Sequence, residues 1–141
     1  MRMNEDFVTY KQAVKLKELG FDWECNHYYN VDHVLCENNN EPFSIFTKDT
    51  YYENHNNDND WSTICSAPTL AQAAKWLREK DICVTSNINI RGGKYKFNWS
   101  ITLFKEGRGI WDESVIYDTY EQALSVGIDK ALNLIEKGDS E

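Results

Sequence analysis

The chain has 141 residues, of which 41% are hydrophobic and 13% aromatic, enough apolar mass for a core and too much for a mainly disordered chain. Its 15 basic and 23 acidic residues give a net charge of -8, which weighs against binding to nucleic acid backbones or anionic membranes. The sequence shows no signal-peptide pattern and no apolar stretch of membrane-spanning length, so we expect a cytoplasmic protein.

Three copies of the pattern T-x-x-Q-A begin at Thr9, Thr69 and Thr119. A threonine hydroxyl can accept a hydrogen bond from the first turn of a helix, and a glutamine three residues later can return one, which forms a capping box. The residues one, four and five positions after each threonine are apolar or tyrosine and would share one helical face. The pattern therefore predicts three capped helices, which end near Gly20, Lys80 and Lys137-Gly138.

The segment between the first two helices contains weaker strand patterns. FDWECNHYY (21–29), HVLCE (33–37) and PFSIFT (42–47) are predicted strands, and WSTIC (61–65) is a fourth candidate. The stretches at 37–41 and 51–61 are rich in asparagine and acid, residues that favour turns, so we expect loops there.

A long β-hairpin is predicted over residues 82–103. Apolar and polar residues alternate on both sides of Gly92-Gly93, and a two-residue turn there pairs positions whose numbers sum to 185. Ile88 then faces Phe97 and Val84 faces Ile101 on the apolar side. A slip of one residue would mix the two faces, so the register is well specified. We expect the second and third helices to cover this whole apolar face, Ile88 and Phe97 included.

IWDESVIY (110–117) is the next predicted strand, after a turn at 106–109. The expected fold is α+β, with antiparallel sheet packed by three capped helices in the approximate order α-β-β-β-α-β-β-β-α. We expect a single domain, 1–141, that can be divided into halves 1–67 and 68–137 with a flexible acidic tail, 138–141. The pattern leaves open whether the strands form one sheet or two.

Few side chains point to chemistry. His27 lies at an apolar position of a predicted strand and is expected to be a core or partly buried imidazole, with a catalytic one as the alternative. His33 beside Asp32 makes a weak base-and-orienter pair, because adjacent strand residues point to opposite faces. The third histidine is His55. No nucleophile elbow, zincin or phosphate-binding motif is present. The four cysteines lack metal-site spacing and are expected to be buried free thiols, with a disulfide or metal role as the alternative: Cys25, Cys36, Cys65 and Cys83. We predict no catalytic, cofactor-binding or metal-binding residue, and no cofactor.

Two weaker binding patterns remain. Asn54 to Asp60, within the 53–60 loop, could offer oxygen ligands to a cation, but it lacks the EF-hand spacing, so a solvated loop is favoured. The order α-β-β-β-α of the second half is that of double-stranded RNA-binding domains, yet the last helix begins with Glu121 in place of a lysine cluster. Basic residues near the hairpin ends are interpreted as solubilising charge, with an anion site as the alternative: Arg91, Lys94, Lys96, Lys105 and Arg108.

Three stretches carry a resemblance: FVTYKQAVKLKELGFDWECNHYY, APTLAQAAKWLREK and YDTYEQALSVGIDKALNLIEK. With them the chain resembles small proteins encoded by gut Bacteroidetes and their phages or prophages. That group has no known activity, so the resemblance implies only an intracellular accessory protein of phage-related origin.

The expected function is therefore a non-enzymatic binding protein that acts through contacts with another protein or with itself, without nucleic acid or membrane. The alternative is a small-molecule-binding domain or a small enzyme whose polar residues converge only in three dimensions. A pocket lined by titratable groups with shifted pKa values would favour that alternative.

Overall fold

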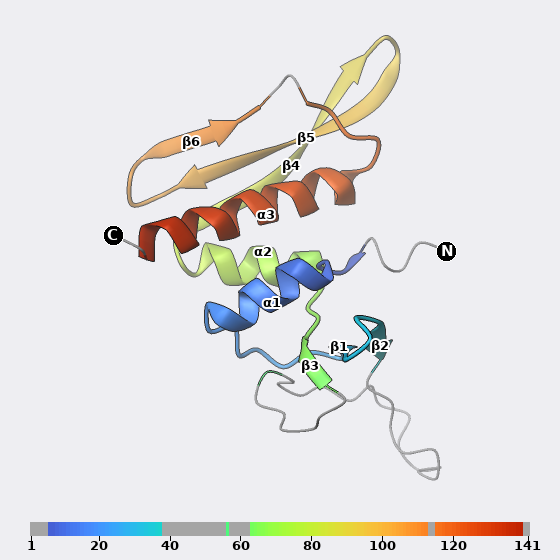
Figure 1. Cartoon of the computed structure of the whole chain (residues 1–141). Helices are drawn as coiled ribbons and strands as arrows, with labels where there is room; N and C mark the ends of the chain where they lie inside the picture. Colours follow the sequence, from blue (N-terminus) through green and yellow to red (C-terminus); the bar gives the residue numbers. More distant parts are fainter. Residues whose placement is uncertain (1–5, 38–55, 57–62, 113–114, 140–141) are drawn as a thin grey trace, which may run out of the picture. The chain divides into compact units, whose positions relative to one another are not determined.

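The computed structural model describes residues 6–37, 56, 63–112 and 115–139 (Figure 1). The element order is α-β-β-β-α-β-β-β-α, with two three-stranded antiparallel sheets, which confirms the predicted α+β fold. The chain divides into two compact units, Phe7–Pro68 and the part from Thr69 onward. Each unit is described by itself below.

The first unit begins with helix α1 (Tyr10–Glu18). Thr9 and Gln12 form the predicted capping box, with Thr9 N–H donating to Gln12 Oε1 at 2.9 Å. At the other end Gly20 adopts a φ of 95°, and its N–H and that of Phe21 donate to the carbonyls of Lys17 and Leu16. This is a Schellman motif, which needs a left-handed residue after the helix and so explains the glycine.

The first sheet has the order β2-β1-β3, built from β1 (His27–Asn30), β2 (Leu35–Glu37) and β3 (Thr63–Ser66). Residues 63–65 of the strand candidate 61–65 therefore lie in the third strand of this sheet, while its first two residues and the predicted strand 42–47 lie outside the described residues. The strand predicted from residue 33 begins only at Leu35, because His33 has a φ of 62° in the turn between β1 and β2. Asn30 Oδ1 accepts from the N–H groups of Asp32 and Val34 and holds that turn.

The prediction of a strand over 21–29 is wrong for its first six residues. Phe21 and Cys25 are buried, but Cys25 forms only an isolated bridge, residues 21–24 and 26 belong to no strand, and a side chain bonds the carbonyl of Phe21. Asn56 Nδ2 donates to Phe21 O at 2.7 Å, and Asn56 Oδ1 accepts from Ser66 N–H at 2.9 Å. Burial at alternate positions can thus arise in an irregular segment that an amide side chain satisfies.

The second unit contains the predicted hairpin, β4 (Ile82–Arg91) and β5 (Lys94–Leu103). All ten observed pairs have numbers that sum to 185, including Ile88 with Phe97 and Val84 with Ile101, which confirms the register. Gly92 and Gly93 have φ values of 58° and 76°, the two positive values that a type I′ turn requires.

The third strand of this sheet, β6 (Arg108–Trp111), begins two residues before the predicted strand 110–117 and is shorter. Arg108 and Gly109, predicted as part of the turn, pair with Leu103 and Thr102. Further along, Tyr117 forms a single bridge with Phe97.

Two helices pack on the hairpin, α2 (Leu70–Arg78) and α3 (Tyr120–Asp139), as Figure 1 shows. Helix α2 ends two residues before Lys80, and α3 continues through the expected stop at Gly138 to Asp139. The two helices and the inner face of the hairpin form the core of this unit: Leu70, Ala73, Leu77, Val84, Trp99, Ile101, Ala123, Leu124, Ile128, Ala131 and Leu132 are buried.

Candidate functional site

The turn end of the hairpin exposes a group of large apolar side chains. Ile88, Ile90 and Tyr95 share one face of the sheet and are 59%, 70% and 65% exposed. We call these three residues the tip patch. They lie on the same face as Val84 and Ile101, which α2 and α3 cover. The prediction that these helices cover the apolar face is therefore confirmed for the half of the hairpin that contains Val84 and Ile101. It is wrong for Ile88, which is exposed.

The start of α3 explains the exposure. Tyr120, its first residue, contacts Phe97 edge-on with ring centroids 6.1 Å apart, and its carbonyl accepts from Ser86 Oγ at 2.9 Å. The hairpin continues beyond this level to its turn at Gly92-Gly93, and Phe97 is only half-buried. The hairpin therefore extends past the first residue of α3.

The opposite face of the hairpin is polar. Thr85 Oγ1 and Ser100 Oγ are 2.6 Å apart, Asn87 Nδ2 donates to Ser100 Oγ at 3.0 Å, and the Asn89 amide donates to Asn98. Their side chains bond one another, and Asn98 is buried. Trp111 of β6, which pairs with Ser100 and is exposed, lies on this same side of the sheet.

A polar ion pair borders the tip. Lys96 Nζ donates to Asp118, and this bond lowers the pKa of the Asp118 carboxyl. Lys94 is exposed beside the turn. Within the described sheet β4 is an edge strand, and its ten residues contain neither proline nor an internal charge. Such strands present unpaired backbone groups to other chains.

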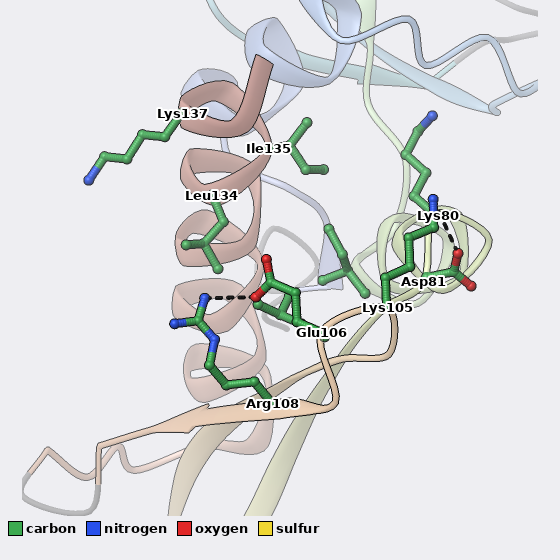
Figure 2. Close-up of a pocket in the computed structure, with 10 residues that line it drawn as sticks. Lys80, Asp81, Lys105, Glu106, Arg108, Leu134, Ile135 and Lys137 are labelled. Atoms are coloured by element: carbon green, nitrogen blue, oxygen red, sulfur yellow. Dashed lines mark ion pairs between the residues drawn. The ribbon is translucent and has the colours of Figure 1, made fainter. Parts of the chain in front are cut away.

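The second unit also contains a pocket of about 320 Å³ at the other end of the hairpin (Figure 2). Its apolar lining consists of Ile82, Leu103, Leu134 and Ile135. Its polar lining consists of four basic and two acidic residues: Lys80, Lys105, Arg108, Lys137, Asp81 and Glu106. Lys105 and Arg108, which the sequence placed among scattered basic residues, therefore lie together at this pocket, while Lys96 lies toward the hairpin turn beside Asp118.

The histidines of the described chain do not converge on a site. His27 is half-buried against Phe7, with ring centroids 4.2 Å apart, as expected for a core position. Burial lowers the pKa of its imidazole, and the charge of Glu37 opposes this in part. His33 stacks on Tyr10 at 3.8 Å, and because it lies in a turn, its pairing with Asp32 on a strand does not arise.

All four cysteines are free thiols, as predicted. Cys25 and Cys65 are buried, and burial raises their pKa values to about 12 and about 11. Thiols with such pKa values stay protonated near neutral pH and are poor nucleophiles. Cys36 and Cys83 are only half-buried, so the expected burial is confirmed for Cys25 and Cys65 and wrong for these two.

The Asn54–Asp60 candidate for cation binding lies outside the described residues except for Asn56, whose side chain bonds Phe21 and Ser66. Within the described ranges, no three histidine, cysteine or acidic side chains are grouped so that they could hold a metal ion. The helices of those same ranges include none long and apolar enough to cross a membrane.

Comparison with protein-family models, with curated proteins and with solved structures finds no match for this chain.

Proposed function

We propose that this chain is a non-enzymatic binding protein that captures an extended segment of another protein along β4, beside the tip patch. The observation that carries the proposal is the joint exposure of Ile88, Ile90 and Tyr95 on one face of the hairpin. Large apolar side chains that gather on a protein surface are typical of contact sites for other proteins.

The edge strand supports the mode of binding. An added strand would take backbone hydrogen bonds from the free edge of β4, as in other complexes formed by strand addition. Because side chains alternate along a strand, every second side chain of the added segment would lie beside Ile88 and Ile90. The partner segment should therefore carry apolar residues at alternate positions. Lys94 follows the turn and is exposed, which favours an acidic residue at that end of the segment.

A second copy of this chain fits the patch less well. Two β4 strands paired along their full length in an antiparallel, two-fold arrangement would place the turn end of each beside the Ile82 end of the other. Each tip patch would then lie next to the half of the partner hairpin that α2 and α3 already cover, and both patches would stay exposed. A segment of a different protein can instead cover the patch directly.

The test is a selection from a random peptide library with the whole chain as bait. We expect peptides with alternating apolar residues to be enriched, and N-methylation of the peptide's alternate backbone amides to abolish their binding. Ile88→Lys should weaken binding roughly ten- to hundredfold, since burial of an isoleucine is worth about 1.5–3 kcal/mol. Fluorescence anisotropy with a labelled peptide measures the affinity.

The matched control is Asn87→Lys, which adds the same charge at the neighbouring, exposed position on the polar face. Equal loss in both variants, no enriched peptide, or unimpaired binding of N-methylated peptides would each contradict the proposal. A concentration-dependent dimer that Ile88→Lys abolishes would assign the patch to a second copy and would also contradict it.

A further inference from the structure

The pocket at the open end of the hairpin has the composition of a small-molecule site. Its volume of about 320 Å³ is at the lower end of the usual range for such sites, about 300–1,000 Å³. Ile82 and Leu103, paired across the hairpin, and Leu134 on α3 are each only half-buried. A ligand in the pocket would cover the exposed parts of these apolar side chains.

Four of the charged side chains at the pocket form two ion pairs whose carboxylates a ligand could replace. Arg108 Nη2 lies 2.9 Å from Glu106 Oε2, and Lys105 Nζ lies 3.6 Å from Asp81 Oδ2 (Figure 2). Both pairs are largely exposed to solvent, where an ion pair contributes little to stability. A carboxylate from a ligand can therefore replace the protein carboxylate with little loss of free energy. The planar guanidinium of Arg108 can donate two parallel hydrogen bonds to such a carboxylate.

The carboxylates at the pocket favour a ligand with a single negative charge. Lys80 Nζ lies over the Trp76 ring, 4.6 Å from its centroid, and Lys137 points away from Arg108 (Figure 2), so Arg108 and Lys105 are the cations that a ligand would meet. The two carboxylates would stay close to the bound group and would repel a second negative charge. This favours a monoanion over a dianion.

A second, smaller cavity lies beside the first. It measures about 190 Å³ and shares Leu134 and Lys137 with the first, and its own lining includes Trp99, Ile101 and Ile110. An aliphatic or aromatic body attached to the carboxylate would lie in the first cavity, against Leu134, on the side of the second.

We infer that this pocket binds a free, monoanionic amphiphile, a carboxylate that bonds Arg108 and Lys105 and carries an apolar body against Leu134. This site is separate from the tip patch, because its lining residues lie at the opposite end of the hairpin. Its test can therefore fail without affecting the proposed protein-binding function.

The probe is octanoate, with 1-octanol as the uncharged control, titrated into the isotope-labelled whole chain. We expect saturable NMR shifts at the amides of 80–82, 103–108 and 134–137, and about tenfold weaker binding of octanol because it lacks the charge-assisted hydrogen bonds. Arg108→Gln and Lys105→Gln should each weaken octanoate binding about fivefold. Lys94→Gln, an equal charge change at the hairpin turn, should leave it unchanged.

Thermal unfolding of each variant checks that it folds; both substituted side chains are exposed at the rim, so no loss of folding is expected. Three results would overturn the inference: equal binding of octanol and octanoate, shifts that map elsewhere, or equal weakening by Lys94→Gln. Absence of saturable shifts at millimolar octanoate, with binding to phosphatidylglycerol vesicles in its place, would also overturn it and would indicate a lipid surface as the anion source.

Discussion

Each of the three threonine caps accepts a hydrogen bond from the backbone N–H of the glutamine three residues later. The distances are 3.2, 3.1 and 3.1 Å for Thr9, Thr69 and Thr119. The alanine four residues after each threonine is fully buried. The shared pattern thus combines a cap with a small residue where the helix packs closely. The expected face is not uniform, because Tyr120, one position after its cap, is 46% exposed.

Among single residues, Thr69 gives the clearest test: Thr69→Ala should lower the free energy of unfolding by about 0.5–2 kcal/mol, because the N–H of Gln72 loses its acceptor. Thr119→Ala should have a similar effect, whereas Thr69→Ser should be tolerated. Gln72→Ala should cost less, since its return bond to Thr69 N–H competes with water. Urea unfolding measures all four variants, and unchanged stability in both alanine variants of threonine would contradict the capping role.

His27 should make stability depend on pH. Its Nε2 is shielded from solvent and makes no hydrogen bond within the described structure, and burial lowers its pKa below the ordinary value of 6.5. The unfolded chain therefore binds a proton more readily than the folded chain. The contribution of the neutral imidazole to the free energy of unfolding is fully present above about pH 6.5, and it is lost as the pH falls toward the folded-state pKa.

His27→Phe should accordingly reduce the loss of stability between neutral and mildly acidic pH. Unfolding free energies of the parent and the variant, measured across this window, give the comparison, since the other titrating groups are common to both. Parallel curves for the two proteins would show that His27 does not titrate differently on folding.

At the scale of elements, close packing of α3 on the hairpin depends on Gly127. A Cβ atom at this position would lie 2.7 Å from Val84 Cγ1 and 2.9 Å from Trp99 Cβ, closer than real contacts allow. Glycine normally weakens the middle of a helix by about 0.8–1.0 kcal/mol relative to alanine. Here the short approach to Val84 and Trp99 requires it.

We expect Gly127→Ala to destabilise the chain despite its better helix propensity. Overpacking costs about 1–3 kcal/mol and exceeds the gain in propensity. Lys130→Ala, at an exposed position of the same helix, is the control and should change stability little. Val84→Ala combined with Gly127→Ala should recover part of the loss in a double-mutant cycle. Greater stability of Gly127→Ala would contradict the close contact.

For the whole molecule, the element order α2-β4-β5-β6-α3 is that of double-stranded RNA-binding domains, but the charge is not. The net charge is -8, and the first turn of α3 carries Glu121. We expect no appreciable binding to duplex RNA or DNA at about 150 mM salt, because such binding depends on cations placed against phosphates. An anisotropy titration with micromolar affinity that weakens steeply with added salt would contradict this.

Local rules were enough to predict the caps and the hairpin. A capping box joins residues three positions apart, and the alternation around Gly92-Gly93 specifies both the turn and every pair of the hairpin. These features need no information about distant parts of the chain. Irregular segments were predicted less well, because the burial of Phe21 and Cys25 resembles that of a strand where the Asn56 side chain in fact bonds the Phe21 carbonyl.

Both candidate sites depend on distances between elements that are far apart in sequence. The apolar pattern of Ile88 and Ile90 was visible, but their exposure follows from the level at which α3 begins against the hairpin. The pocket forms where the ends of α2, β4 and β5 meet the last turns of α3, so Lys105 and Leu134 become neighbours only after packing. Short-range hydrogen bonds and the periodicity of apolar residues specify each element from the sequence. The level at which one element begins against another is decided only when the two elements pack.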